Sequence, residues 1–313
     1  MRIAILGATS QIAKDLILSF AAQKSSDELV LFARRPDAVA AWLARTGLSG
    51  RYAIADFGTF GMETSFDALL NFVGVGNPAQ AAAMGTAIFD ITLQYDEMAL
   101  HYQRRYPDCR YIFLSSGAAY GGNFEQPADE NTRANIPIND LQPQDWYAAA
   151  KLHAECRHRS LAQFPIVDLR VFNYFSRTQD LSARFFITDL IRSICSGEKM
   201  ITSPDNIMRD YLGPDDFSQL VSRVLAAPPA NAALDCYTLA PTDKMSLLRA
   251  MQAQFGLAFE VRDGPAGVNA TGMKMHYFST NRKAAAFGYQ PSRSSLDSVM
   301  DEARIVLNRS SAL

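Results

Sequence analysis

Cysteine is scarce in this sequence, and its spacing fits neither a metal site nor a disulfide framework. The cysteines are Cys109, Cys156, Cys195 and Cys236. No two of them form a Cys-x-x-Cys pair, and no histidine pair lies nearby, which excludes the usual zinc and disulfide patterns. We therefore expect no metal, and we expect small buried thiols in a protein of the reducing cytoplasm.

Histidine is equally scarce, and its spacing is not typical of metal ligands. The histidines are His101, His153, His158 and His276. We expect them to have ordinary surface or packing roles.

An excess of positive charge and long apolar runs are also missing. The net charge of −2 and the pI near 6.1 argue against a nucleic-acid or anionic-membrane partner, because such partners select a basic surface. No apolar run reaches the length of about 20 residues that a transmembrane helix needs. With 48% hydrophobic and 20% charged residues, the sequence has the balance of a soluble globular protein, and we expect neither a nucleic-acid nor a membrane partner.

Short apolar runs alternate with amphipathic stretches in the first half, which is typical of βαβ units and a parallel sheet. The expected strands are Arg2–Leu6, Glu28–Ala33, Arg51–Ala55, Ala68–Val73, Arg110–Ser115 and Ile166–Phe172. The expected helices are Ile12–Gln23, Pro78–Tyr106 and the segment that carries Tyr147. This order predicts an α/β fold with a doubly wound parallel sheet of the Rossmann type.

The pattern loosens after residue 173. The expected later helices are Ser182–Ser196, one that Asp215 and Asp216 cap, Ser246–Phe255 and one from Leu296, and the expected later strands are Cys236–Leu239 and Ala258–Arg262. We expect residues 1–173 to form a dinucleotide-binding domain to which residues 214–241 return. Residues 174–213 and 242–313 would then form a smaller substrate-binding part.

The segment GATSQIA, Gly7–Ala13, follows the first strand and opens a helix. Dinucleotide-binding loops use glycines there, so that the backbone can approach the pyrophosphate at the helix N-terminus. Ser10 and Ala13 replace two of these glycines but are small. The loop residues expected to contact a cofactor are Gly7, Thr9, Ser10, Gln11 and Ile12. The alternative is an ordinary strand–turn–helix without a ligand.

The end of the second strand, ELVLFARRP, bears on which dinucleotide fits. An acidic residue there would bind the ribose 2′-hydroxyl of NAD, whereas arginine accommodates the 2′-phosphate of NADP. Arg34 and Arg35 stand at this end, so NADP(H) is favoured and NAD(H) remains possible. The alternative is a solvated basic pair. Asp56, after the third strand, meets the adenine or starts a turn.

The segment WYAAAKLHAE places Tyr147 and Lys151 four residues apart in a stretch rich in alanine. Alanine favours a helix, and positions i and i+4 of a helix share one face. The two side chains are therefore neighbours, either as a functional pair or as two surface residues. A serine also ends the fifth strand, in FLSSGAAYGG, at the edge where such sheets bind ligands.

Together these motifs resemble the extended short-chain dehydrogenase/reductase family, notably its nucleotide-sugar epimerases and reductases. The order of glycine loop, strand-end serine and Tyr-x-x-x-Lys matches that family. Three further segments are similar to family motifs, namely LRVFN (Leu169–Asn173), RDYLGPDD (Arg209–Asp216) and FGYQPS (Phe287–Ser292). The resemblance spans almost the whole chain.

The resemblance implies roles for individual residues. Tyr147 would be the general acid/base, and Lys151 would lower its pKa and hydrogen-bond the nicotinamide ribose. Counting back from Tyr120 places the family serine at Ser116, where it would stabilise charge on the substrate oxygen. The remaining implied cofactor contacts are Phe57, Val73, Gly74, Ser115 and Phe172, and the implied substrate contacts are Ser116, Tyr120, Asn173 and Arg209.

Asn173 and Arg209 match family positions that contact the diphosphate of a nucleotide sugar, and an arginine can hold a diphosphate with two hydrogen bonds. The alternatives are a turn residue at the strand end for Asn173, and a surface ion pair with Asp210 or Asp205 for Arg209.

The chain departs from the family at three places. Ser116-Gly117-Ala118 stand where the dehydratases carry Thr-Asp-Glu, so elimination of water is not expected. The segment 71–74 reads Asn-Phe-Val-Gly instead of His-Leu-Ala-Ala, and Gly213-Pro214 replace His-Val.

Three functions stay open after these observations. The first is an NADP(H)-dependent reductase of a keto group on a nucleotide-linked deoxysugar, which the two arginines favour. The second is an NAD-dependent nucleotide-sugar epimerase, and the third a non-catalytic dinucleotide-sensing relative. The family also implies a homodimer through the helix that carries Tyr147 and the long helix before it, with Ala148, Ala150 and Ala154 allowing close packing.

Overall fold

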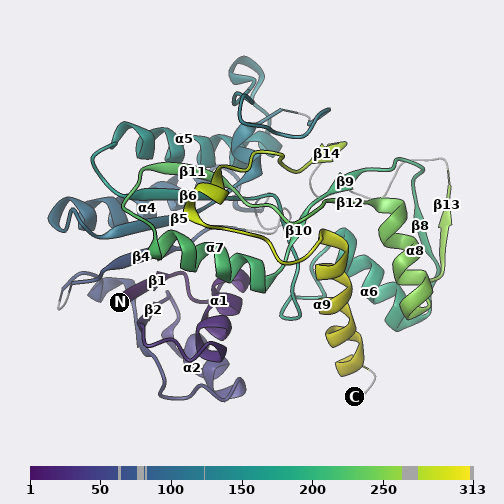
Figure 1. The fold of residues 1–313 in the computed structure, drawn as a ribbon, viewed down its shortest axis with the longest axis horizontal. Coiled ribbons are helices and arrows are strands. Elements are labelled where there is room, and N and C mark those ends of the chain that lie inside the picture. Colours follow the sequence, from purple (N-terminus) through teal and green to yellow (C-terminus); the bar gives the residue numbers. More distant parts are fainter. Residues whose placement is uncertain (63–64, 76–80, 82, 123, 263–273, 311–313) are drawn as a thin grey trace.

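A computed structural model describes residues 1–62, 65–75, 81, 83–122, 124–262 and 274–310. Its central sheet has seven parallel strands in the order β11-β6-β5-β4-β1-β2-β3 (Figure 1). These are β1 (Arg2–Leu6), β2 (Glu28–Phe32), β3 (Ala53–Ala55), β4 (Ala68–Asn71), β5 (Arg110–Ser116), β6 (Ile166–Val171) and β11 (Ala232–Asp235). The order reverses between β1 and β4, and in such sheets a crevice opens at this point beyond the carboxyl ends of the strands.

Helices cover both faces of the sheet (Figure 1). On one face lie α1 (Gln11–Ala22), α2 (Pro36–Arg45) and α7 (Pro214–Ala226), and on the other lie α4 (Ala87–Arg105) and α5 (Trp146–Ser160). Strand β1 shows how the sequence specifies this arrangement. Ile3 and Ile5 pack into the core with α1 and α7, whereas Ala4 and Leu6 pack into the core with α4 and α5, as the alternation of side chains along a strand requires.

The later part of the chain builds a second core beside the sheet. It is shared by α6 (Phe186–Ser196), α8 (Lys244–Phe255) and α9 (Ser295–Ser310). Short strands form three small sheets of their own, separate from the central sheet. They are β7 (Asn173–Tyr174) with β10 (Tyr211–Leu212), β8 (Met200–Thr202) with β13 (Phe259–Val261), and β9 (Met208–Arg209) between β12 (Thr242–Asp243) and β14 (His276–Tyr277). The division into two domains at residue 173 stays a prediction.

The fold class predicted from the sequence is confirmed, and several local predictions are wrong. The last strand of the sheet is Ala232–Asp235, before the predicted Cys236–Leu239, because AALD pairs with β6 although it carries a weaker apolar signal. Asp215 and Asp216 lie in the first turn of α7, and its N-cap is Gly213. The predicted start of the long helix at Pro78 lies outside the described residues.

Burial also corrects two expectations about small residues. Cys109 and Cys236 are buried as expected, but Cys156 and Cys195 are exposed. Ala148, Ala150 and Ala154 are buried within the subunit, so they do not offer a surface for a partner. A homodimer stays a prediction from the family resemblance.

No helix in the part of the chain that the structure describes is long and apolar enough to cross a membrane. Among the same residues, no group of three or more histidine, cysteine or acidic side chains is arranged to hold a metal ion.

Candidate active site

Tyr147 lies in the first turn of α5, close to the carboxyl end of β5. Burial raises the pKa of the Tyr147 phenol, and a hydrogen bond with Ser116 opposes this shift. Ser116 ends β5, and its hydroxyl also accepts a hydrogen bond from the Ala118 N–H at 3.1 Å. The neighbouring Ser115, which the resemblance implies as a cofactor contact, donates instead to Glu155 at 2.5 Å. The structure therefore brings Ser116, and not Ser115, to Tyr147.

Lys151 is buried one helical turn after Tyr147, with 5% of its surface exposed. Its Nζ donates to the Leu114 carbonyl oxygen at 2.7 Å and lies 5.9 Å from the centre of the Tyr147 ring. Burial lowers the pKa of Lys151 to about 8, although nearby carboxylates favour its charged form. The ammonium is thus fixed beneath the phenol, where it can favour a phenolate by electrostatic attraction.

A third hydroxyl, which the sequence analysis missed, belongs to Tyr277 of β14. Its oxygen lies 3.3 Å from the Ser116 Oγ, and Tyr147 influences its pKa, so three hydroxyls meet at one point. Tyr277 packs against Phe124 and Phe172. No local signal marks Tyr277, because β14 is only two residues long and reaches the site through its pairing with β9.

Phe172 and Tyr120 belong to the same aromatic cluster. The rings of Tyr120 and Phe172 are stacked, with their centres 6.4 Å apart. The Tyr120 hydroxyl donates a hydrogen bond to Asp235 at 2.9 Å. A Cβ atom at Gly117 would lie 2.2 Å from the Phe172 ring. The position where dehydratases carry an aspartate therefore has no room for a side chain unless the ring moves.

The loop before α1 fits a dinucleotide phosphate. Gly7 has a φ of +81°, and a Cβ there would lie 2.9 Å from the Val73 backbone nitrogen, so a side chain would collide with the β4 loop. Ser10 is the N-cap of α1 and accepts from the Ala13 N–H at 3.3 Å. The free N–H groups of this first turn follow directly, and they can bind an anion.

The other loop residues expected to contact a cofactor have different surroundings. Gln11 donates to the Ser176 hydroxyl at 2.9 Å, Ile12 packs on the core, and Thr9 is half-buried in the turn. Gly74 lies opposite the lysine, since a Cβ there would be 3.7 Å from the Lys151 Nζ. The first turn of α1, the β4 loop and Lys151 thus lie next to one another at the carboxyl edge of the sheet.

Arg34 and Arg35 are both exposed between β2 and α2, where two guanidinium groups can receive a phosphate. Asp56 accepts from the Gly58 N–H at 2.6 Å and caps a 3₁₀ turn, which agrees with the turn alternative. Phe57 packs against Tyr95, with ring centres 4.7 Å apart.

Arg209 and Asn173 both contact the segment 274–277. Arg209 is buried and donates to the carbonyl oxygens of Met208 and Lys274, so the alternative of a surface ion pair is wrong. Asn173 lies in β7 and donates to the Tyr277 carbonyl oxygen at 3.1 Å. Both side chains therefore brace the segment that carries Tyr277.

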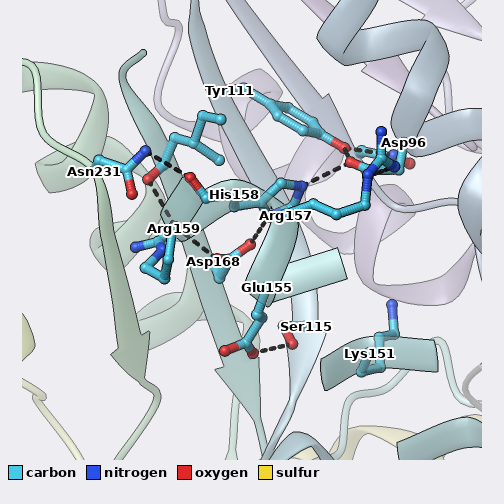
Figure 2. A network of polar contacts seen from close by, with 12 residues as sticks. Asp96, Tyr111, Ser115, Lys151, Glu155, Arg157, His158, Arg159, Asp168 and Asn231 are labelled. Atoms are coloured by element: carbon cyan, nitrogen blue, oxygen red, sulfur yellow. Dashed lines mark hydrogen bonds and ion pairs between the residues drawn. The ribbon is translucent and has the colours of Figure 1, made fainter. Parts of the chain in front are cut away.

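A buried ionic network lies beside Lys151, on the α4 and α5 side of the sheet (Figure 2). His158 is fully buried, and its two ring nitrogens lie 2.6 Å from Asp168 and 2.7 Å from Asp96. Burial opposes the charged imidazole, but the two carboxylates outweigh it and raise the pKa of His158 to about 9. His158 therefore packs as an imidazolium between two carboxylates, a more specific role than the sequence predicted.

The same network reaches the loop after β4 through Asn71, where the family carries histidine. Asp96 accepts from the Tyr111 hydroxyl at 3.0 Å, and that hydroxyl accepts from the Asn71 amide at 2.9 Å. Asn71 in turn accepts from the Val73 N–H. The network thus fixes the loop beside Lys151 by hydrogen bonds that continue from α4 to β4.

Removing the hydroxyl of Tyr111 tests this link. We expect Tyr111→Phe to weaken cofactor binding several-fold with little change in kcat, because the Asn71 amide loses its buried partner and the loop loses its fixed position. Cofactor KM and kcat, measured beside Tyr106→Phe as a control at the C-terminal end of α4, separate the outcomes. Loss of stability alone, with an unchanged cofactor KM, would contradict a positioning role.

Comparison with solved structures shows the same fold over nearly the whole chain. UDP-glucose 4-epimerase from Bifidobacterium longum, solved with NAD+ and UDP, superposes with a TM-score of 0.76 at 15% identity, covering 99% of this chain and 98% of that one. dTDP-glucose 4,6-dehydratase from Bacillus anthracis, solved with NAD, gives 0.78 at 13% identity over 99% and 98%. RMD from Pseudomonas aeruginosa, solved with NADPH, gives 0.73 at 17% identity over 98% and 100%.

No curated protein sequence matches the chain. A family model does match, and it covers residues 3–240, which include the glycine loop, Ser116, Tyr147 and Lys151. The chain therefore belongs to the NAD dependent epimerase/dehydratase family.

Proposed function

We propose that the protein is an NADP(H)-dependent reductase of a keto group on a nucleotide-linked sugar. The observation that carries this proposal is the meeting of Ser116, Tyr147 and Lys151 at the carboxyl edge of the sheet. The close approach at Gly7 and the first turn of α1 support a dinucleotide in the crevice beside them. A reduced nicotinamide bound there supplies the hydride.

The residues of the chain would perform the proton chemistry. Ser116 and Tyr147 would hold the carbonyl oxygen by hydrogen bonds, so that negative charge developing on it is stabilised. Tyr147 would give its proton to that oxygen as the carbon receives hydride, which converts the ketone to an alcohol. Lys151 would then stabilise the phenolate, which is reprotonated from solvent.

Elimination of water is not supported, because Ser116, Gly117 and Ala118 offer no carboxyl group for it and Gly117 has no room for one. Epimerisation with a retained NAD is the second candidate. The same Ser116, Tyr147 and Lys151 would serve it, and two of the similar structures above were solved with NAD or NAD+. We prefer NADP(H) because Arg34 and Arg35 are both exposed directly after β2, at the strand end where arginine accommodates the 2′-phosphate of NADP.

Removal of these two guanidinium groups tests the cofactor. We expect Arg34→Ala combined with Arg35→Ala to weaken NADPH binding by about 10- to 100-fold, because hydrogen bonds to a charged phosphate contribute about 1.5–3 kcal/mol. NADH binding should hardly change, since NADH lacks the 2′-phosphate. Titration of nucleotide fluorescence measures both.

Arg45→Ala is the matched control, because Arg45 is exposed at the other end of α2. Equal losses for NADPH and NADH, or no loss for either, would contradict the assignment of the arginines to the 2′-phosphate.

A further inference from the structure

Lys274 places a positive charge over the aromatic wall of the active site. Its Nζ lies 4.6 Å from the ring centre of Tyr277 and 5.2 Å from that of Phe124. Within the described part of the chain, this ammonium group makes no hydrogen bond and no ion pair. The two rings stabilise the positive charge in part by cation–π contact. The N–H groups of the ammonium can therefore donate to a ligand.

A second cation lies over the same ring. The Arg209 guanidinium carbon is 5.9 Å from the centre of Tyr277. Burial and the charge of Arg209 lower the pKa of Lys274 to about 8, and Asp145 opposes them. Asp145 is itself engaged by the Gln142 N–H at 3.0 Å. The half-buried ammonium is therefore not neutralised, and an arriving anion would be attracted to it.

The protein holds this cation in a defined place. β14 pairs with β9, with Tyr277 opposite Arg209, and the Arg209 side chain donates to the Lys274 carbonyl oxygen at 2.7 Å. The backbone under Lys274 is thus fixed to the strand that carries Arg209. A charge so placed suits recognition of a specific group better than a charge on a flexible surface side chain.

The position relative to the reacting atoms indicates which anion fits. The Lys274 ammonium lies over the ring of Tyr277, and the hydroxyl of the same ring lies beside Ser116. The width of one aromatic ring therefore separates the cation from the proposed carbonyl site. An acidic group on the sugar, next to the reacting carbon, would reach it directly.

We propose that Lys274 recognises a carboxylate on the sugar, so that the preferred substrates are nucleotide-linked sugar acids. This inference rests on the proposed function, because it assigns the acid to the sugar that reacts at Ser116 and Tyr147. Under this proposal Lys274 determines substrate specificity, and it contributes nothing to the binding of neutral sugars.

Matched pairs of sugar nucleotides test the proposal. The probes are UDP-glucuronate against UDP-glucose and GDP-mannuronate against GDP-mannose, with binding measured by calorimetry in the presence of NADP+. In at least one pair we expect the wild-type protein to bind the acid about 10-fold or more tightly than the neutral sugar. Lys274→Met should remove most of that preference and leave the neutral sugar unaffected.

Lys283→Met is the control, since Lys283 is exposed nine residues later, and it should retain the preference. UDP and GDP alone are the third probe. If Lys274→Met loses as much affinity for UDP or GDP as it loses for the sugar acid, the cation binds the diphosphate. That result would overturn the proposal.

The outcomes for the inference and for the proposed function are distinguishable. If both members of a pair bind, and the ratio of their affinities is the same in wild type and Lys274→Met, the inference is wrong. The proposed reductase function would not be affected by that result. Binding of no sugar nucleotide by the wild-type protein overturns both.

Discussion

Replacement of Tyr147 by phenylalanine is expected to lower turnover by about 10²- to 10⁴-fold, the usual contribution of a positioned general acid. The variant keeps the ring, which lies 5.9 Å from the Lys151 Nζ, and loses only the hydroxyl that meets Ser116. Cofactor affinity should therefore stay close to that of the wild-type protein. Steady-state turnover of a keto-sugar nucleotide and a cofactor titration on the same preparation measure the two quantities.

The matched control is Tyr106→Phe, which removes a phenol hydroxyl at the end of α4, where Tyr106 packs against Tyr102. Its turnover should equal that of the wild-type protein. If Tyr147→Phe retained turnover within a few-fold, Tyr147 would not be the proton donor, and Tyr277, the other phenol beside Ser116, would become the candidate.

His158→Leu is expected to cost about 3–5 kcal/mol in the free energy of unfolding, because it removes a buried cation and leaves Asp96 and Asp168 facing an apolar side chain. The effect should depend on pH. The pKa of His158 is raised from its ordinary value of 6.5 to about 9 in the folded protein. Its stabilising contribution is therefore complete below pH 6.5 and is lost as the pH rises through 9.

Urea denaturation of wild type and variant at pH 6 and at pH 10 measures this difference. The gap in unfolding free energy should be wide at pH 6 and narrower at pH 10. His153→Leu is the control, since His153 is exposed on the same helix, and its effect should stay within about 0.5 kcal/mol. A gap that does not change with pH would contradict the charged state of His158.

The sequence was sufficient to predict the sheet and the pair on α5. Strands β1, β4 and β5 are continuous apolar runs buried on both faces, and such runs predict a parallel sheet directly. Tyr147 and Lys151 are related by the helical repeat alone, so their proximity follows from local geometry. The choice of Ser116 over Ser115 came from counting residues in a motif, and the contacts of both serines agree with it.

Contacts between distant segments were beyond the reach of sequence patterns. Tyr277 meets Ser116 across 161 residues, through two-residue strands that carry no periodicity of their own. His158 lies on the face of α5 that also carries Lys151, a position where the pattern leads one to expect an apolar residue. Its role is clear only once Asp96 and Asp168 are placed on either side of it.

The most direct test of the central claim is the identity of the nucleotide that the protein prefers. One sample of the purified protein is denatured, and any nucleotide that it releases is identified by mass spectrometry. A second sample, freed of bound nucleotide, is titrated with NADPH and with NADH. We predict an empty or exchangeable site that binds NADPH at least 10-fold more tightly than NADH. Stoichiometric, tightly held NAD would contradict the reductase and would indicate the epimerase instead.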